Sequence, residues 1–437
     1  MALLKGYSQL EEKLQSLASP GIRPGLARLS KLLSLAGHPE RKFKAVHIVG
    51  TNGKGSTAAT LASILSEAGY RTALYTSPHL VSFGERLMIN GAQASADKWL
   101  SYVSKTEQFI SNCSFFDDNI PTYFELITAI AFMIIADEDV DIAIIEAGMG
   151  GRLDASNILA KVILSVIVPI GLDHTEYLGG TLVKVANEKF AVMRPGVPAI
   201  FAGGADDVEE AFFARASLLG APAQVLRRLC SVTLKDVSLY GTDFCIENEC
   251  LCADYHTPLV GTFQADNAAL AVMAANQLIR SGFDRVDMET IQRGVAKTRW
   301  PGRFNLLRRE PPLVIDGGHN PHAMKRIVET IGALKFSGSL NIVLAMMKDT
   351  DISESLLLLK PLGARICCTE VPAMERCMSA GDLCELVSRC GLNAAGTFDV
   401  PTDAVNAASA DGGAVVCCGS LYLVGYLMEH VNDISGI

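Results

Sequence analysis

The sequence predicts an α/β fold: a P-loop parallel sheet flanked by helices, followed in the chain by a second, smaller Rossmann-like α/β domain. Three observations lead to this prediction. An apolar strand near residue 45 runs into a glycine-rich loop and then a helix. Short apolar strands alternate with helical stretches on both sides of residue 300, and a segment containing proline and glycine separates the two series.

The glycine-rich loop is Gly50-Thr-Asn-Gly-Lys-Gly-Ser56, between the strand Ala45–Val49 and an Ala- and Leu-rich helix, Lys54–Ala68. Glycines let the backbone direct consecutive N–H groups at phosphate oxygens, and the helix N-terminus adds positive potential. Lys54 supplies a charge and Ser56 can reach a magnesium ion. The loop therefore predicts a nucleoside triphosphate site, although Gly55 separates the lysine from the serine. The alternative is an ordinary strand-to-helix turn.

Strands and helices continue to alternate after this loop. We expect strands at Thr72–Tyr75, Asp141–Glu146 and Val162–Val166, and helices at Asp97–Ile110 and Tyr123–Ala136. In such sheets ligands bind beyond the carboxyl ends of the strands. The loops that follow these strands are therefore candidate site positions.

A second alternating series follows Trp300-Pro-Gly-Arg303, with a strand at Leu313–Asp316, a helix at Pro321–Leu334 and a strand at Leu340–Ala345. Before it, residues 225–260 form short alternating segments that predict a small antiparallel addition. The stretch 298–312 is the expected boundary, which gives domains of residues 1–298 and 299–437.

The composition is that of a soluble enzyme. The chain has 437 residues and a net charge of −9, which argues against broad nucleic-acid binding. It contains no apolar run long enough to cross a bilayer, and its N-terminus lacks the pattern of a signal peptide. We expect a cytoplasmic protein with neither membrane nor nucleic acid as a partner.

The twelve cysteines include no CxxC pair, so neither disulfides nor zinc are favoured. Cys367-Cys368 and Cys417-Cys418 lie in apolar runs and are expected in the core. The cluster Cys245, Cys250 and Cys252 lacks metal-ligand spacing, and we do not assign it a metal.

Polar side chains follow several predicted strands. Ser77 follows the strand 72–75, Glu146 ends the strand 141–146, and Asp173-His174 follows the strand 162–166. An acidic residue in this position is where a magnesium partner of a phosphate loop is expected, and Glu146 fits. Taken singly, His174 and Ser77 are also common capping or hydrogen-bonded structural residues. Because magnesium takes few protein ligands, Ser56, Ser77, Glu146 and His174 together suggest two ions.

These motifs, with others, occur in the order found in the folylpolyglutamate synthase/dihydrofolate synthase family of Mur-type ATP-dependent amide ligases, which the chain resembles from about residue 17 to residue 420. The motifs that carry the resemblance are Gly50–Ser56, Thr76–Leu80, Thr122–Glu125, Glu146–Asn157, Leu172–Thr175, Asn187–Phe190, Arg194–Gly196, Asp266–Ala268, Trp300–Arg303 and Asp316–Pro321.

The resemblance implies a chemistry that needs no enzyme nucleophile. In this family a substrate carboxylate attacks the γ-phosphate of ATP to give an acyl phosphate, and the amine of L-glutamate then displaces phosphate. The implied partners are ATP, Mg²⁺, L-glutamate, dihydropteroate, and tetrahydrofolate with its polyglutamates. The implied activity serves folate biosynthesis and one-carbon metabolism, in a bifunctional enzyme that we expect to be a monomer. The implied domains are an ATP- and folate-binding Mur-type central domain and a C-terminal Mur ligase-type domain.

The resemblance also assigns roles to residues. ATP would be held by Asn52, Gly53, Lys54, Gly55, Ser56, Asn267, Arg303, Asp316 and His319. Magnesium would be held by Ser77, Glu146 and His174, with Ser56 as a further contact. The pterin end would meet Ser16–Ser19, Thr122, Tyr123, Phe124, Glu125, Leu153, Asp154 and Ala155. The residues implied in catalysis are Lys54, His174, Lys189 and Arg303.

Lys189 matches the family's carboxylated lysine, so we expect it to carry a carbamate formed from carbon dioxide. A carbamate reverses the sign of the side chain and can coordinate magnesium, whereas an ammonium adds to a cationic site. The alternative is a surface lysine paired with Glu188.

Two departures from the family pattern concern single contacts. Phe263 stands where a histidine usually precedes the ATP-binding asparagine, and Ala18 stands where some bacterial members have a histidine in the pterin segment. Neither touches the triphosphate or magnesium motifs.

Three other functions remain open at this stage. The first is folylpolyglutamate synthase activity alone. The second is another Mur-type ligase, which would need an N-terminal UDP-binding domain, although only about fifty residues precede the phosphate loop. The third is a nucleotide-dependent switch, for which the chain has no guanine-specificity motif.

Overall fold

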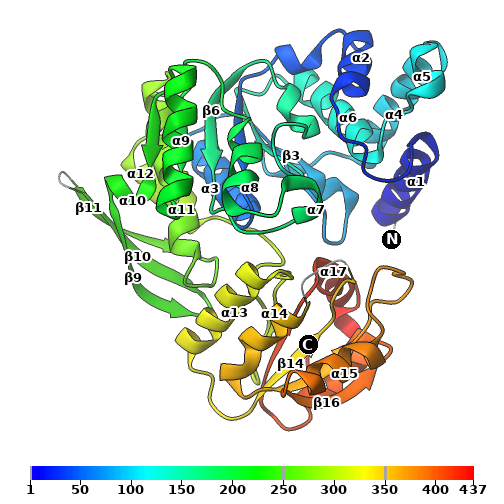
Figure 1. The fold of residues 1–437 in the computed structure, drawn as a ribbon, viewed down its shortest axis with the longest axis vertical. Coiled ribbons are helices and arrows are strands. Elements are labelled where there is room, and N and C mark those ends of the chain that lie inside the picture. Colours follow the sequence, from blue (N-terminus) through cyan, green and yellow to red (C-terminus); the bar gives the residue numbers. More distant parts are fainter. Residues whose placement is uncertain (1, 249–250, 349–351) are drawn as a thin grey trace. The chain divides into compact units, whose positions relative to one another are not determined.

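The computed structural model describes residues 2–248, 251–348 and 352–437 (Figure 1). By their contacts the residues divide into two units. The first comprises Met1–Ser231, Ile246–Leu251 and Asp266–Thr298, and the second comprises Val232–Cys245, Cys252–Ala265 and Arg299–Ile437. This division differs from two consecutive ranges because parts of the segment 232–265 pack with the second unit.

An eight-stranded sheet forms the centre of the first unit, in the order β4-β3-β2-β5-β1-β6-β7-β8. Its strands are β1 (Ala45–Val49), β2 (Thr72–Tyr75), β3 (Leu87–Ile89), β4 (Ala92–Gln93), β5 (Ile142–Glu146), β6 (Val162–Ile167), β7 (Ala199–Phe201) and β8 (Ala223–Val225). The pairs from β2 to β8 are parallel, as predicted. The short strands β3 and β4, which the sequence analysis did not identify, add an antiparallel edge.

Helices cover both faces of this sheet, and the central strands β1 and β5 are therefore buried throughout. One face packs Tyr75 and Ile145 against α1 (Ala2–Leu17), α2 (Ala27–Leu35), α4 (Ala96–Ser111) and α6 (Tyr123–Asp137) in one hydrophobic core. Helix α3 (Lys54–Glu67) has no residue in that cluster, contacts β1, β2 and β5, and packs against α12 (Met288–Ala296). Side chains alternate between the two faces of a strand, so the sheet separates two apolar layers.

The other helices before residue 300 are α5 (Phe115–Asp118), α7 (Thr175–Leu178), α8 (Leu182–Phe190), α9 (Asp206–Leu219), α10 (Leu226–Leu229), α11 (Gln264–Arg280) and α12 (Met288–Ala296). Helices α8 and α9 lie side by side (Figure 1). The predicted helices 97–110 and 123–136 are confirmed, as α4 and α6, to within one residue at each end.

A separate three-stranded sheet consists of β9 (Ser231–Ser238), β10 (Gly241–Asn248) and β11 (Leu251–Thr257), in the order β11-β10-β9. Connections of two residues permit only antiparallel neighbours, so the predicted antiparallel addition is confirmed. Val237 and Leu239 pack against the core of the second unit.

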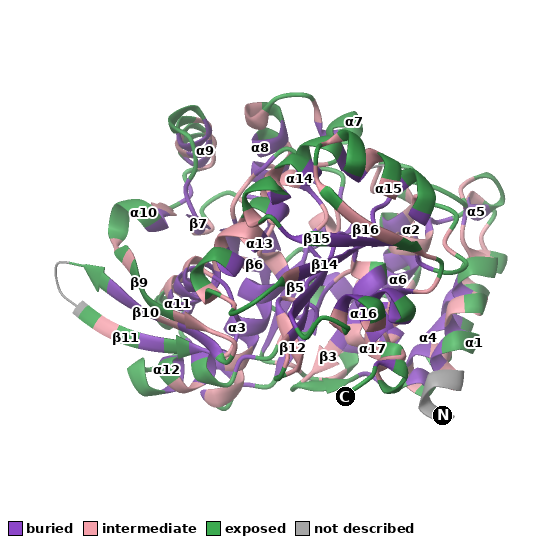
Figure 2. Ribbon diagram, turned by 90° about the horizontal axis from the view of Figure 1, so that it is seen from below, coloured by how far each residue is buried: buried purple, intermediate pink, exposed green. Residues whose placement is uncertain are grey.

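The second unit is built on a six-stranded sheet in the order β12-β13-β17-β14-β15-β16. Its strands are β12 (Asn305–Arg308), β13 (Leu313–Ile315), β14 (Leu340–Leu344), β15 (Arg365–Thr369), β16 (Asn393–Phe398) and β17 (Ala414–Cys418). Its helices are α13 (Pro321–Leu334), α14 (Ile352–Leu359), α15 (Ala380–Arg389), α16 (Pro401–Ser409) and α17 (Leu421–Glu429). All pairs except β12 with β13 are parallel, and β14 and β15 are largely buried (Figure 2). This is the second α/β domain that the alternation predicts.

His47 is a polar residue in the middle of the first sheet. It lies in β1 and is fully buried. Its Nε2 is 2.8 Å from Ser156 Oγ, which also contacts the carboxylate of Asp154. Burial, together with the charge of Arg194, lowers the pKa of His47 to about 3.

This depressed pKa predicts a loss of stability in mild acid. The unfolded chain, with an ordinary histidine pKa near 6.5, binds more protons than the folded chain between pH 6.5 and about 3, so folding becomes less favourable as pH falls through 6.5. The size is about 2 kcal/mol between pH 7 and pH 5. Urea unfolding should show that the wild type loses about this much more than His47→Gln over that range. Parallel pH curves for the two proteins would contradict the assignment.

Candidate functional site

The phosphate loop joins the carboxyl end of β1 to α3, whose first residue is Lys54. Gly53 precedes the helix with φ = 98°, in the left-handed region that glycine tolerates. Gly53 has no side chain to cap the helix, so the N–H groups of the first turn are directed at the space where an oxygen ligand can bind. A left-handed glycine before an uncapped helix N-terminus is compatible with the predicted phosphate loop.

Asn267 lies directly beside this loop: a Cβ added at Gly53 would be only 2.4 Å from Asn267 Oδ1. Its carbonyl also accepts a hydrogen bond from Thr57 Oγ1 at 3.4 Å. Helix α11 thus brings a predicted nucleotide contact to the glycine loop over more than two hundred residues of chain.

Thr51 ties the loop to the segment that follows β6. Its N–H donates to Pro169 O at 2.9 Å, its hydroxyl donates to Gly171 O at 3.0 Å, and the same hydroxyl accepts from Gly171 N at 3.0 Å. Thr51 was not among the predicted site residues. Its partners are too distant in the chain for a local pattern to reveal them.

Lys54 and Glu146 come together at the ends of the neighbouring strands β1 and β5. Lys54 Nζ donates to Gly50 O at 3.4 Å and to Thr51 O at 3.2 Å, and lies 3.9 Å from Glu146 Oε1. Glu146 is 5% exposed. A buried carboxylate beside a lysine that is predicted to bind phosphate can take part in holding a cation.

Lys189 lies in the same space and is not on the surface. Its side chain on α8 is buried and its Nζ donates to Gly50 O at 2.8 Å. Burial and the charge of Lys54 lower the pKa of Lys189 to about 7. The alternative of a surface lysine paired with Glu188 is wrong, because Glu188 pairs with Arg152 at 3.0 Å.

The glycine-rich turn after β5 packs closely on its neighbours. A Cβ at Gly151 would lie 3.0 Å from Lys189 Cα, and a Cβ at Gly148 would lie 2.6 Å from Phe124 Cζ and 3.3 Å from Asp154 Oδ2. This turn therefore brings together Lys189 and two residues predicted for the pterin end.

Asp154 is fixed by its hydrogen bonds. Its carboxylate accepts from Met149 N at 2.8 Å and from Ser156 N at 2.9 Å, and burial raises its pKa. The adjacent Ala155 is buried, whereas Leu153 is an exposed apolar side chain. Residues 153–155 thus present one apolar and one carboxylate side chain from a short segment.

Thr122 and Glu125 close the N-terminus of α6 with a capping box, in which Glu125 Oε2 accepts from Thr122 N at 2.7 Å. The same oxygen accepts from Arg28 Nε at 2.9 Å. Glu125 Oε1 is buried, with no hydrogen-bond partner in the described part of the chain. Arg28 was not predicted, since only the fold brings α2 to α6.

The N-terminal segment also reaches this region. Ser19 N donates to Pro121 O at 2.9 Å, and Ser19 bridges to Thr122 as in a parallel sheet. Tyr123 is half-buried, with its hydroxyl 3.4 Å from Glu11 Oε1. Ser19, from the predicted segment Ser16–Ser19, and Thr122 are therefore neighbours.

The four predicted magnesium ligands follow four adjacent strands. Ser56, Ser77 and Glu146 come after or at the ends of β1, β2 and β5, and His174 follows β6. His174 has φ = 48° at the start of α7, and its side chain is 51% exposed. Within the described ranges no three His, Cys, Asp or Glu side chains gather into a metal site. An ion bound here would thus depend on hydroxyl, water or phosphate oxygens as well.

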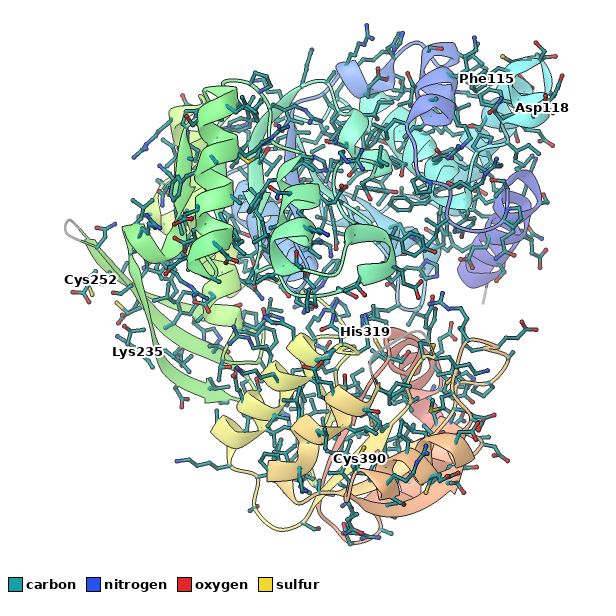
Figure 3. All side chains as sticks on the ribbon, in the orientation of Figure 1. Phe115, Asp118, Lys235, Cys252, His319 and Cys390 are labelled. Atoms are coloured by element: carbon teal, nitrogen blue, oxygen red, sulfur yellow. The ribbon has the colours of Figure 1, made fainter. Side chains whose placement is uncertain are left out.

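The second unit holds Arg303, Asp316 and His319 close to one another. Asp316 is buried and accepts from Phe304 N at 2.9 Å and Gly318 N at 2.7 Å. Burial raises the pKa of Asp316, and the charge of Arg303 opposes that rise. His319 Nδ1 is 3.0 Å from Gly317 O, just before α13 (Figure 3).

Arg303 lies against Gly317, where a Cβ would be 3.2 Å from its guanidinium. Phe263, which stands in place of a family histidine, packs on Gly261, where a Cβ would lie 2.8 Å from its ring. The phenyl ring therefore has a packing role where the usual residue could donate a hydrogen bond.

Cys367, Cys368, Cys417 and Cys418 are buried in β15 and β17, as predicted. Cys250 lies outside the described residues. Across the described part of the chain, no helix combines the length and apolarity needed to span a bilayer.

Comparisons with known proteins agree with this arrangement. Residues 48–275 match the Mur ligase middle domain, and residues 302–421 match the glutamate ligase domain of Mur ligases. The chain is 35% identical over 331 residues to the dihydrofolate synthase/folylpolyglutamate synthase of Bacillus subtilis, covering 75% of this chain and 77% of the relative. It is 33% identical over 426 residues to the Escherichia coli protein of the same name, covering 96% and 94%.

Solved structures show the same similarity. Escherichia coli FolC in complex with DHPP and ADP superposes with a TM-score of 0.86 at 31% identity, covering 98% of this chain and 97% of that one. Mycobacterium tuberculosis folylpolyglutamate synthase complexed with ADP and AMPPCP gives a TM-score of 0.86 at 28% identity, covering 98% of each chain.

Proposed function

Because the chain belongs to the folylpolyglutamate synthase/dihydrofolate synthase family of Mur-type ligases, we propose that it is an ATP-dependent ligase that adds L-glutamate to dihydropteroate and to reduced folates. The observation that supports this most directly is the grouping of Lys54, Glu146 and the buried Lys189 beside the phosphate loop. The set suits phosphoryl transfer rather than hydrolysis by an enzyme nucleophile.

In the proposed reaction a carboxylate oxygen of the acceptor attacks the γ-phosphorus of ATP, the bond to the β-phosphate oxygen breaks, and ADP leaves. The amine nitrogen of L-glutamate then attacks the acyl carbon, phosphate leaves, and the nitrogen loses a proton to form the amide. The triphosphate is held by the backbone N–H groups of the phosphate loop and by its residues Asn52, Gly53, Lys54, Gly55 and Ser56. Asn267, Arg303, Asp316 and His319 are the remaining proposed nucleotide contacts.

Ser77, Glu146, His174 and Ser56 are the residues we propose for magnesium. The donor types fit, because hydroxyl and carboxylate oxygens are hard ligands and Glu146 is buried where a charge needs a partner. Magnesium, when bound, supplies charge neutralisation at the β- and γ-phosphates.

We place the pterin end of the acceptor at Thr122, Tyr123, Phe124, Glu125, Leu153, Asp154 and Ala155. Phe124 and Leu153 offer apolar surface. The buried Glu125 Oε1, which has no hydrogen-bond partner among the described residues, offers an acceptor for a ring N–H group. We propose that residues 1–298 form the ATP- and folate-binding domain and that residues 299–437 form the Mur ligase-type C-terminal domain. We also propose that the protein is a cytoplasmic monomer.

The first prediction concerns substrate range. Incubation with ATP, L-glutamate and either dihydropteroate or tetrahydrofolate should release phosphate and add one glutamate mass to each acceptor, since the Bacillus subtilis and Escherichia coli relatives are named for both activities. Phosphate release and product mass are the measurements. Product from tetrahydrofolate alone would reduce the activity to folylpolyglutamate synthase. No product from either acceptor would favour another Mur-type ligase or a nucleotide switch.

We further propose that Lys189 carries a carbamate. Carbamylation needs an uncharged amine, and burial beside Lys54 lowers the pKa of Lys189 to about 7, so a large share of the amine is neutral at physiological pH. The carbamate would supply a further oxygen ligand next to Glu146.

Lys189→Ala should therefore lose activity and recover part of it when a short carboxylic acid such as formate or acetate replaces the missing carboxylate. Initial rates with and without the acid provide the measurement. Lys184→Ala, on the exposed side of the same helix, is the matched control. It should keep wild-type activity, and the added acid should not change its rate. Full activity of Lys189→Ala without additives would rule out the carbamate.

Arg303→Ala should lower turnover by about 100-fold or more, because the guanidinium is proposed to stabilise charge on the transferring phosphate. Arg309→Ala is the control, since Arg309 is an exposed arginine of the same segment. Thermal unfolding should be similar for both variants. Normal turnover in a folded Arg303→Ala protein would remove Arg303 from the mechanism.

A further inference from the structure

A pair of cysteines lies on the outer face of the three-stranded sheet. Phe244 of β10 and Tyr255 of β11 stack with ring centroids 5.5 Å apart on the buried face. Side chains alternate along a strand, so the odd-numbered residues of β10 and the even-numbered residues of β11 share the opposite, polar face. Cys245 and Cys252 both belong to this polar face.

The two thiols are in contact. Cys245 Sγ lies 3.1 Å from Cys252 Sγ, across the two neighbouring strands. A disulfide bond is about 2.0 Å long and is accommodated between adjacent antiparallel strands. The sulfur atoms therefore need to approach by only about 1 Å, which a change of side-chain torsion supplies.

The two thiols differ in exposure and in electrostatic surroundings. Cys252 is exposed, whereas Cys245 is 6% exposed. The carboxylate of Asp254 accepts from Lys235 Nζ at 2.6 Å and hydrogen-bonds the Cys245 thiol. The hydrogen bond with Cys252, followed by burial and by Asp254, raises the pKa of Cys245 to about 11. Cys252 (Figure 3) is thus the thiol that is accessible to a dissolved reagent. The less exposed Cys245 is its neighbour on the adjacent strand.

We propose that Cys245 and Cys252 form a reversible disulfide and that this pair is a site at which hydroperoxides oxidise the chain. The thiolate of Cys252 attacks the terminal peroxide oxygen, the O–O bond breaks, and Cys252 becomes a sulfenic acid. The other oxygen takes a proton and leaves as an alcohol, or as water when the oxidant is hydrogen peroxide. The sulfur of Cys245 then attacks the Cys252 sulfur, hydroxide leaves and takes the thiol proton. Two thiols and one hydroperoxide give one disulfide, one water and one alcohol, or two waters from hydrogen peroxide.

The core cysteines do not share this reactivity. Cys417 and Cys418 are fully buried, and burial raises the pKa of each thiol. A core role also does not explain the outer pair, because the apolar face of the hairpin is the opposite one. The arrangement favours oxidation of Cys245 with Cys252 before the core cysteines.

The test uses the full-length reduced protein and hydrogen peroxide as the probe. After oxidation, remaining thiols are alkylated and the protein is digested and examined by mass spectrometry. We expect the loss of two free thiols per chain, a linked peptide joining Cys245 to Cys252, and full reversal with dithiothreitol. The bridge closes a short loop, so the oxidised protein should also unfold at a higher temperature than the reduced one.

Cys252→Ser should abolish the linked peptide, and Cys390→Ser, which removes a half-buried cysteine from another element, should not. Because Cys252 is exposed, the variant is expected to fold, and its thermal unfolding in reducing buffer checks this. A sulfinic acid on Cys252 without a bridge, a bridge to Cys250, or equal loss of thiols in wild type and Cys252→Ser would overturn the proposal.

Discussion

Charge held out of water around the end of β1 is the constraint on which the candidate site depends. Lys189, Glu146 and Asp154 are each at most 6% exposed, and Lys54 lies among them. An isolated buried charge is costly, so each group has to share its charge with a neighbour or lose it. The structure does both: backbone carbonyls and amides satisfy Lys54 and Asp154, and the lowered pKa of Lys189 shifts that amine toward its neutral form.

A site built in this way is incomplete without its ligands. The loop amides and Lys54 offer positive potential for phosphate, while Glu146 offers negative charge for a cation. The protein itself compensates part of this charge, since Lys54 Nζ lies 3.9 Å from Glu146 Oε1. We therefore expect a bound phosphate and a bound cation to stabilise this charged arrangement further.

Local patterns predicted much of the fold. Apolar runs of four to six residues between glycine-rich turns gave the strands, and the long amphipathic or apolar stretches gave α4 and α6. The carboxyl ends of β2, β5, β1 and β6 are adjacent in the sheet, which is why Ser77, Glu146 and the segment of His174 could be grouped before the strand order was known. The antiparallel edge was missed because β3 and β4 have only three and two residues.

The burial of Lys189 could have been predicted from the helical pattern of its neighbours, which the alternative of an ion pair with Glu188 did not consider. Val185, Ala186, Lys189 and Phe190 recur with the period of a helix and form its buried side, whereas Glu188 lies one step around. This apolar pattern, unlike the adjacent charge of Glu188, predicts correctly that the Lys189 side chain faces the protein interior. The partners of Glu125 and Thr51 had no such signal, since Arg28 and Gly171 are 97 and 120 residues away in the chain.

The paired hydrogen bonds between Thr51 and Gly171 affect how this loop can be transferred between proteins. Thr51 in the loop Gly50–Ser56 is held by a segment that follows another strand, so the loop's conformation depends on more than its own seven residues. Grafting them onto a different strand–helix junction would carry the glycines and the lysine without that support. The part that must be transferred as a whole is the pair of strands β1 and β6 with the loop that follows each. In a chimera of two homologous proteins, the conformation of Gly50–Ser56 should be preserved only when both strands and both loops come from the same parent.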